Sequence, residues 1–375
     1  MNTKIWLSSP HMSGKEQFYI NEAFDLNWVA PLGPNVNGFE NDLERYLEDD
    51  IHVAALASGT SALHLGLILL GVEKGDEVIC QSKTFSASAN PIAYLGATPV
   101  FVDSEKDTWN ICPEQLENAI KDRIAKGNKP KAIIAVHLYG MPYKVDEIRI
   151  IANKYEIPIL EDSAESLGST YKNKKCGTFG DLAILSFNGN KIITTSGGGA
   201  LVTKSDALKE KAVFLSTQAR DNAPHYQHSE IGYNYRMSNI VAGIGRGQMT
   251  VLDNHVNKRR SNHAFYKQEF SDIQEIKFLE EPTEMFSNRW LTCIQLPSYK
   301  IREELREFLL KDNIESRPLW KPMHLQPVFE NAPSYINGVS ENLFKKGLCL
   351  PSGSNLTDNE LIRVVLGIKT YFAKC

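Results

Sequence analysis

One lysine stands in the stretch SFNGNKIITTSGGG, residues 186–199, which begins at the end of an apolar run from Leu182 to Phe187. Such a run is typical of a buried strand. An ammonium held near the end of a buried strand tends to lose its proton, because desolvation disfavours the charged form, and a neutral amine can form a Schiff base. Lys191 is therefore the candidate imine-forming residue. This stretch alone leaves one alternative open, a solvated lysine in a glycine-rich turn.

The composition is that of an ordinary globular protein. The chain has 375 residues, enough for a large domain and a smaller one, with 42% hydrophobic and 23% charged residues. Its net charge is −4 and its pI is near 6.2, so no basic field favours a nucleic acid as partner. No apolar stretch has the length of a membrane span, and the first ten residues lack a secretion signal. We therefore expect a cytoplasmic protein with no membrane or nucleic-acid partner.

The cysteines are scattered along the chain without a paired CxxC spacing. This pattern is typical of reduced thiols in the cytosol rather than of disulfides or metal ligands, so we expect no metal site. The cysteines are Cys80, Cys112, Cys176, Cys293, Cys349 and Cys375.

Short apolar runs alternate with helical patterns through roughly the first half of the chain. Alternation of this kind predicts an α/β fold with a mostly parallel sheet covered by helices on both faces. In such sheets, ligands bind at the carboxyl ends of the strands. The expected strands are 53–57, 77–80, 99–102, 132–138, 158–160, 182–187 and 198–203, and the expected helices are 36–47, 61–70, 87–95, 113–126, 145–155 and 207–215.

The pattern changes in the last third of the chain. The elements expected there are a long helix over 240–270, a strand over 290–296, a helix over 302–310 and an extended run over 314–320. Thr357 with Glu360 forms a capping box that begins a last helix, which ends near Phe372. We expect a large α/β domain with an N-terminal arm over 1–250, and a small C-terminal α+β domain over 251–375.

Small polar residues follow the first expected strand and open a helix with the sequence SGTSA, residues 58–62. Free backbone N–H groups and hydroxyls at a helix start make a seat for an anion such as phosphate. Capping of the helix by Ser58 or Thr60 is an equally ordinary explanation. The hydroxyl of Ser186, at the end of another strand, is a second phosphate candidate.

Two other strand ends carry residues that suit a planar, charged ring. Phe85 follows the strand over 77–80 and can stack on a flat cofactor, although a lone phenylalanine is more often part of the core. Asp162 and Glu165 follow the strand over 158–160. Asp162 stands where the apolar run stops, so its carboxylate needs a cationic partner to stay charged, and a protonated pyridine nitrogen would serve. A helix cap or a salt bridge is the alternative for this acid.

The segment ESRPLWKPMH, residues 315–324, concentrates cations and an indole. Arg317, Trp320, Lys321 and His324 suit a diphosphate with a flat base or a sugar. An exposed strand edge with charged side chains is the plain alternative.

A phosphate seat, a stacking ring, an acid for a ring nitrogen and an imine-forming lysine, in that order, describe a pyridoxal phosphate (PLP) site. The chain resembles the sugar aminotransferases of the DegT/DnrJ/EryC1/StrS family, which have the aspartate aminotransferase fold (PLP-dependent fold type I), over essentially its whole length. The motifs that carry the resemblance are SGTSA at 58–62, EDSAESLG at 161–168, SF at 186–187 with Lys191, and GYNYR at 232–236. The resemblance implies that the large domain binds PLP.

Four further motifs resemble the C4 aminotransferases of bacillosamine-type pathways, which act on a UDP-linked 2-acetamido-4-keto-6-deoxyhexose. These motifs are NGNKIITTSGGG at 188–199, STQAR at 216–220, SNRWL at 287–291 and RPLWK at 317–321. The resemblance implies a homodimer with shared active sites that takes an amino group from L-glutamate, releases 2-oxoglutarate and passes through pyridoxamine phosphate (PMP). The implied product is a UDP-4-amino-4,6-dideoxy-N-acetylhexosamine for surface polysaccharide biosynthesis.

The family implies a role for each matching residue. Lys191 would form the Schiff base with PLP and then move a proton between the donor Cα and the cofactor C4′. Asp162 would pair with the pyridine nitrogen, and Phe85 would stack on the ring. The expected phosphate contacts are Thr60, Ser61 and Ser186, with Asn234 reaching the phosphate from the partner subunit. The expected substrate contacts are Arg220, Trp320, Lys321 and His324.

Two positions depart from the family pattern. Position 165 is often glutamine and is here Glu165, so its contact with the cofactor ring and O3′ stays open. Position 188 is often histidine and is here Asn188, to which we assign no chemistry.

Three other functions fit the chain less well. A sugar 3-dehydratase of the same fold would carry histidine in place of Lys191, and a non-catalytic sensor or scaffold would have lost site residues that are all present here. A nicotinamide dehydrogenase would need a glycine fingerprint after its first strand. The residues leave open whether the new amine at C4 is equatorial or axial, and the choice of UDP over dTDP or GDP depends on the resemblance alone.

Overall fold

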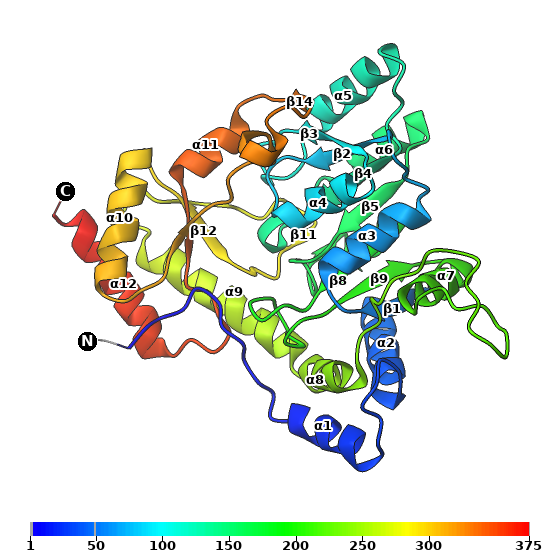
Figure 1. Ribbon diagram of the computed structural model, residues 1–375. Coiled ribbons are helices and arrows are strands. Elements are labelled where there is room, and N and C mark those ends of the chain that lie inside the picture. The colour runs from blue at the N-terminus through cyan, green and yellow to red at the C-terminus, as the bar shows by residue number, and fades with distance from the viewer. Residues whose placement is uncertain (1–2, 49, 375) are drawn as a thin grey trace.

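A mostly parallel sheet of eight strands organises the fold (Figure 1). The strand order is β1 (His52–Leu56), β9 (Gly199–Thr203), β8 (Leu182–Ser186), β5 (Ile159–Asp162), β4 (Ala132–Val136), β2 (Glu77–Gln81), β3 (Thr98–Val102) and β14 (Ser334–Tyr335). The computed structural model describes residues 3–48 and 50–374. β9 runs antiparallel to its neighbours β1 and β8, whereas the other described pairs of this sheet are parallel.

The central strands are buried on both faces. Ile133 packs in one apolar core and its neighbour Ile134 in another, and both side chains are fully buried. Continuous apolar strands of this kind are expected where helices cover both faces, so the predicted fold class is confirmed. One face is covered by α3 (Gly59–Leu69), α4 (Ser86–Tyr94) and α7 (Asp206–Ser216), and the other by α2 (Pro34–Leu47), α5 (Pro113–Ala125) and α6 (Val145–Tyr155).

A smaller antiparallel sheet lies toward the left of Figure 1. Its strand order is β10 (Lys277–Phe278), β12 (Thr292–Gln295), β15 (Gly347–Leu350) and β13 (Arg317–Pro318). It shares one apolar core with α10 (Tyr299–Lys311), α12 (Asp358–Phe372) and the end of α9 (Leu252–Glu269). The predicted capping box is confirmed, because Thr357 and Glu360 each bond to the other's backbone at the start of α12.

Two segments connect the N-terminal and C-terminal parts of the chain. Ile5, in the N-terminal arm, is fully buried in the core of the smaller sheet. In the opposite direction, β14 extends the edge of the large sheet by pairing with β3. The division into domains at residue 250 stays a prediction, and these segments hold its two sides together.

The single helix predicted over 240–270 is wrong, because the structure has two helices there. α8 (Asn239–Met249) ends before Thr250, and α9 begins at Leu252. Between them the β-branched Val251 has a φ of −125°, outside the helical region, so the chain changes direction there.

α1 (Glu16–Asp25), which the sequence patterns did not predict, packs against α8. A methyl group on Gly247 would lie 2.8 Å from the Glu16 backbone nitrogen, and one on Gly245 would lie 2.7 Å from the Phe39 ring of α2. The glycines of α8 therefore permit an approach that larger residues would prevent.

The remaining elements are short. β6 (Thr170–Tyr171), β7 (Lys174–Lys175) and β11 (Met285–Phe286) form a third sheet, and α11 (Val339–Lys346) leads into β15. None of the helices formed by residues 3–48 and 50–374 is both long and apolar enough to cross a membrane. The described cysteines are free and buried, and Cys375 lies outside the described residues.

The glycines at the end of the stretch 186–199 let β9 start directly beside the turn between β1 and α3. A methyl group on Gly199 would overlap the carbonyl carbon of Ser58 and the nitrogen of Gly59. A side chain at this position would therefore push the two backbones apart.

We expect Gly199→Ala to lower the free energy of unfolding by about 2 kcal/mol, because an added methyl group strains this contact. Guanidinium unfolding followed by circular dichroism measures the change. Gly197→Ala is the matched control, since nothing lies within 4 Å of a methyl group there. Equal stabilities of the two variants would contradict the close approach.

Candidate active site

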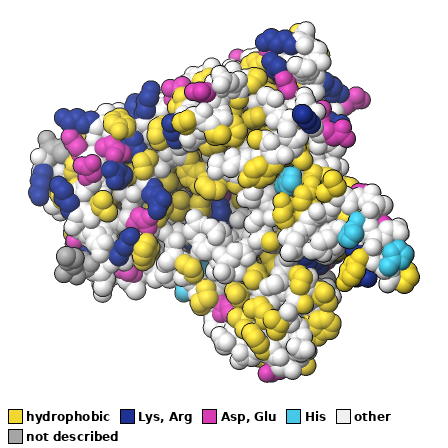
Figure 2. All heavy atoms as spheres, in the orientation of Figure 1, with side chains coloured by type: hydrophobic (Ala, Val, Ile, Leu, Met, Phe, Trp, Pro, Cys, Tyr) yellow, Lys and Arg dark blue, Asp and Glu magenta, His cyan; other side chains and the backbone are white. Residues whose placement is uncertain are grey.

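A cavity of about 730 Å³ opens at the carboxyl ends of the parallel strands, within the size range of ligand sites. Figure 2 shows a hollow on this face, edged by hydrophobic side chains. Side chains at or shortly after strand ends make one wall, among them Asp162 at the end of β5, Glu165 three residues later, and Lys191 five residues after β8. The opposite wall comes from the C-terminal part of the chain and includes Trp290, Leu291, Arg317, Trp320 and Lys321.

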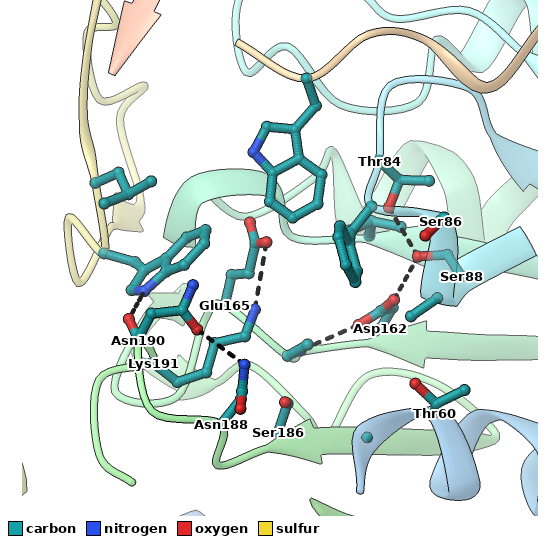
Figure 3. A pocket seen from close by; sticks show the side chains of 18 of the residues that line it. Thr60, Thr84, Ser86, Ser88, Asp162, Glu165, Ser186, Asn188, Asn190 and Lys191 are labelled. Carbon is teal, nitrogen blue, oxygen red and sulfur yellow. Dashed lines mark hydrogen bonds and ion pairs between the residues drawn. The ribbon is translucent and has the colours of Figure 1, made fainter. Parts of the chain in front are cut away.

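The Lys191 amine lies between a carboxylate and an indole ring. Its Nζ is 3.4 Å from Oε1 of Glu165 (Figure 3) and 4.3 Å from the ring centroid of Trp290. The lysine side chain is only 11% exposed, so a solvated lysine in a turn does not describe it. Trp290 is held in place because its Nε1–H donates to the carbonyl of Asn190 at 2.7 Å. The amine therefore faces a confined part of the cavity.

A buried arginine holds the turn that carries Lys191. Arg259, on α9, donates to the carbonyl oxygens of Trp290 at 2.6 Å and Lys191 at 3.3 Å, and to the Ser8 hydroxyl at 3.0 Å. These acceptors are neutral, and burial lowers the pKa of Arg259 to about 9. Hydrogen bonds offset the cost of burying this cation and tie the lysine turn to α9 and the N-terminal arm.

Asp162 is a buried carboxylate that faces the cavity. Its Oδ2 accepts a hydrogen bond from the Ser88 hydroxyl at 2.7 Å, and its Oδ1 accepts one from the Ala164 N–H at 3.1 Å (Figure 3). Burial raises the pKa of Asp162, and these hydrogen bonds offset part of the rise. None of the described Lys or Arg side chains forms an ion pair with it. The site therefore suits a ligand that brings its own positive charge.

A hydrogen bond from Tyr139, whose backbone is strained, fixes the position of Glu165. Its Oε2 accepts the N–H of Tyr139 at 2.7 Å, and Tyr139 has a φ of 56°, which is uncommon outside glycine. The Tyr139 hydroxyl accepts the N–H of Trp320 at 2.9 Å. Burial raises the pKa of Glu165, and the charge of Lys191 offsets part of the rise. Tyr139 therefore couples this carboxylate to the opposite wall of the cavity.

The start of α3 combines a cap with an open anion seat. The Ser58 hydroxyl accepts the N–H of Ser61 at 3.0 Å and lies 2.8 Å from the Ser61 hydroxyl, so both belong to the cap. Thr60 and Ser186 line the cavity. A methyl group on Gly59 would lie 2.9 Å from Cβ of Ser186, which puts that serine beside the free N–H groups of the helix.

The rings expected to meet a flat ligand lie together. Phe85 is 55% exposed and its ring centroid is 4.7 Å from that of Trp320, with an interplanar angle of 74°. Both rings line the cavity, and Lys321 lines it too. The core alternative for Phe85 does not fit its exposure.

Four of the expected contacts are not among the described residues that line the cavity. Ser61 belongs to the cap of α3. His324 lies 2.7 Å from the Ser82 hydroxyl through Nδ1, and Arg220 is exposed with its guanidinium over the Tyr226 ring. Asn234 is also exposed, which leaves it available to a second copy of the chain.

The sequence pattern of the DegT/DnrJ/EryC1/StrS aminotransferase family matches residues 10–369. This chain belongs to that family. Bacillus subtilis EpsN, provisionally named a pyridoxal phosphate-dependent aminotransferase, is 53% identical to this aminotransferase over 97% of the chain and 95% of EpsN. The GDP-perosamine synthase of Escherichia coli O157:H7 is 36% identical over 97% of each chain.

Solved structures agree with the family. The PLP form of Spr1654, a provisionally named sugar aminotransferase from Streptococcus pneumoniae, has a TM-score of 0.91 and 27% identity over 99% of each chain. Its PMP form has the same TM-score. The predicted family and fold type of this aminotransferase are thus confirmed.

Sequence reasoning missed four residues that shape the site of this aminotransferase. Ser88 had a weak signal in the sequence, because it lies four residues after Thr84. In the structure the two hydroxyls are 2.7 Å apart. Trp290 stood inside a quoted motif but had no role attached. Tyr139 and Arg259 act through backbone groups that are distant in sequence, so no local pattern indicates them.

We expect Lys191→Ala to destabilise the ligand-free protein by about 3 kcal/mol at pH 8 and by clearly less at pH 5. Without the ammonium, the folded-state pKa of the buried Glu165 rises further above its unfolded-state value. The stability linked to that proton is present at low pH and is lost as the pH rises through the folded-state pKa. Urea unfolding at the two pH values measures the difference.

The double variant Lys191→Ala with Glu165→Gln is the control, because glutamine does not titrate. Its loss of stability should depend on pH clearly less than that of Lys191→Ala, and the remaining dependence reflects Asp162, whose raised pKa the charge of Lys191 also offsets in part. A loss for Lys191→Ala alone that does not depend on pH would contradict the electrostatic coupling of the two side chains.

Proposed function

We propose that this aminotransferase moves an amino group from L-glutamate to the C4 ketone of a UDP-linked 2-acetamido-2,6-dideoxyhexos-4-ulose, with PLP as its cofactor. One observation carries the proposal. The amine of Lys191 and the carboxylate of Asp162, which has no described cationic partner, face one cavity beside an open helix N-terminus. The product, a UDP-4-amino-4,6-dideoxy-N-acetylhexosamine, would serve the synthesis of a surface polysaccharide.

The residues of the cavity fit PLP. A protonated pyridine nitrogen would supply the cation that Asp162 lacks. Ser186 and the first N–H groups of α3 would hold the phosphate, because only a glycine at position 59 leaves the helix start open beside Ser186. Phe85, exposed on the cavity wall, would cover one face of the ring.

When bound, PLP supplies an aldehyde and a ring that takes up electrons. Lys191 would take the proton from the glutamate Cα and return it to C4′, acting as general base and then as general acid. Glu165, 3.4 Å from the lysine Nζ, would hold the released amine in reach between these transfers. The buried indole of Trp290, with its ring centroid 4.3 Å from the amine, would help to exclude water there.

The position of the bacillosamine-type motifs supports a UDP-linked sugar. Three of the four motifs contribute cavity residues, namely Asn188, Asn190, Lys191, Gly197, Gly198, Trp290, Leu291, Arg317, Pro318, Trp320 and Lys321. A GDP-linked keto sugar is the second candidate, because three GDP-perosamine synthases are 34–36% identical over 97% of this chain.

Adding L-glutamate to the PLP-loaded protein should remove the visible absorbance of the bound cofactor, and adding the UDP-linked keto sugar should restore it. Lys191→Ala should bind PLP but show neither change, because no group then moves the proton. Stopped-flow absorbance measures both half-reactions, and NMR of the product assigns the C4 configuration.

The GDP-linked and dTDP-linked keto sugars are the controls for the second half-reaction. Recovery with the GDP-linked sugar alone would favour the second candidate. Turnover by Lys191→Ala would contradict the assignment of the lysine, and failure of glutamate to change the wild-type spectrum would contradict the amino donor.

We also propose that two copies form a dimer with shared sites. Large side chains in the segment that leads to Asn234 are exposed, with Ile231 at 84% and Tyr226 at 79%. A second copy would cover them, and Asn234 would then reach the phosphate bound by its partner.

Co-expression of Lys191→Ala with Asn234→Asp tests the shared site. Each variant alone should be inactive, the second because its carboxylate repels the phosphate. In mixed dimers one of the two sites is wild type, so random pairing should restore about a quarter of the wild-type activity. Activity no higher than that of the single variants, with dimers seen by sedimentation, would contradict sharing.

A further inference from the structure

The N-terminal arm is anchored along the edge of the cavity. The Ile5 N–H donates to the carbonyl of Asn313 at 3.0 Å, and the Glu315 N–H donates to the carbonyl of Ile5 at 2.9 Å. Next along the arm, the Leu7 N–H donates to Oε2 of Glu315 at 3.0 Å. The arm thus pairs with the segment that leads into β13 and has a fixed position there.

This anchoring sets the direction of Trp6. Neighbouring side chains of an extended chain point to opposite sides, and Ile5 is fully buried in the core of the smaller sheet. Trp6 accordingly points away from that core, is 53% exposed and lines the same cavity as Lys191. Packing in the core does not account for an indole that is half exposed in a ligand cavity.

One cation lies over this ring, and two others line the same cavity. The Nζ of Lys4 is 3.7 Å from the Trp6 ring centroid, and Arg317 and Lys321 line the cavity with it. Glu315 is the acid among them and accepts Nε–H of Arg317 at 2.9 Å. Lys4 and Arg317 are the two cations whose charges act on Glu315, so two cations against one carboxylate leave a positive charge beside Trp6, and the Arg317 side chain is 69% exposed.

The cavity connects Trp6 with the reacting end. The Ser8 hydroxyl donates to the carbonyl of Asn190 at 2.8 Å, and Asn190 precedes Lys191. Trp6 is two residues from Ser8, so their Cα atoms are at most about 7 Å apart. The cavity of about 730 Å³ therefore extends from Lys191 to Trp6 with room for a second ligand beside a small cofactor.

We propose that Trp6, with Lys4 and Arg317, forms the nucleotide subsite of this enzyme, where the base stacks on the indole and the cations hold the diphosphate. This inference rests on the proposed function, and it assigns binding to an arm that no motif marked. Stacking accepts every base because each has a flat π face, so this subsite holds the nucleotide without selecting uracil or guanine.

Trp6→Ala tests the subsite in the PLP-loaded enzyme, with UDP and GDP as probes in isothermal titration calorimetry. Loss of one stacking contact should raise the Kd of both nucleotides roughly 5- to 100-fold. Trp6→Phe should recover most of the affinity. Conversion of the cofactor by L-glutamate, which requires no nucleotide, is followed in both variants as a separate readout of the aminotransferase chemistry.

Tyr299→Ala is the matched control. Tyr299 is 57% exposed, carries the Arg302 guanidinium 4.9 Å from its ring centroid, and is not among the described residues that line the cavity. This variant should bind both nucleotides like the wild type, which separates stacking in the cavity from loss of an exposed aromatic ring in general.

The outcomes separate this inference from the proposed function. An unchanged Kd for UDP in Trp6→Ala would overturn the subsite, while glutamate conversion by the same protein would leave the aminotransferase intact. A weaker Kd for one nucleotide only would overturn the claim that the subsite ignores the base. If wild-type enzyme converts its cofactor with glutamate but binds neither nucleotide, both the subsite and the nucleotide-sugar substrate are wrong.

Discussion

Two buried carboxylates face one amine at the inner end of the cavity, and the site is built around this imbalance of charge. Asp162 and Glu165 are both buried, burial raises the pKa of each, and the Lys191 amine lies against Glu165. Among residues 3–48 and 50–374, the hydrogen-bond donors to Asp162 are neutral, namely the Ser88 hydroxyl and the Ala164 N–H. Burying a carboxylate costs free energy unless a cation pairs with it. Asp162 therefore indicates a ligand that carries a positive charge. A protonated pyridine ring fits that description.

The outer end of the cavity has the opposite imbalance. Lys4 and Arg317 outnumber Glu315 there, beside the exposed ring of Trp6. A cofactor with a protonated ring at one end and a substrate with a diphosphate at the other would neutralise both. Shared contacts fix the two ends of the cavity relative to each other, because the N-terminal arm that carries Trp6 also forms a hydrogen bond with the turn that carries Lys191.

Much of the candidate site could be predicted because its residues follow strands. Lys191, Asp162, Phe85, Ser186 and Thr60 come just after apolar runs, and parallel strands end at one edge of the sheet, so their side chains meet there. Trp320 and Lys321 were predicted from their chemical character and do line the cavity. His324 was not brought in, because the short helix that carries it turns its ring toward Ser82 and Glu341. The family and the fold type followed from the motifs and agree with the comparisons.

The sequence by itself determined most elements of the large sheet and which chemical groups stand at the strand ends, because apolar runs, helix caps and glycine turns depend on residues close in the chain. Even so, α1 and the break at Val251 escaped it, because the pattern over 240–270 continues through the point where the φ of Val251 leaves the helical region. Only the tertiary structure decided what surrounds each group. Tyr139 behind Glu165, Trp290 and Arg259 around Lys191, and Trp6 at the outer end come from segments far apart in sequence. Their positions depend on packing and on backbone hydrogen bonds, which no local pattern encodes.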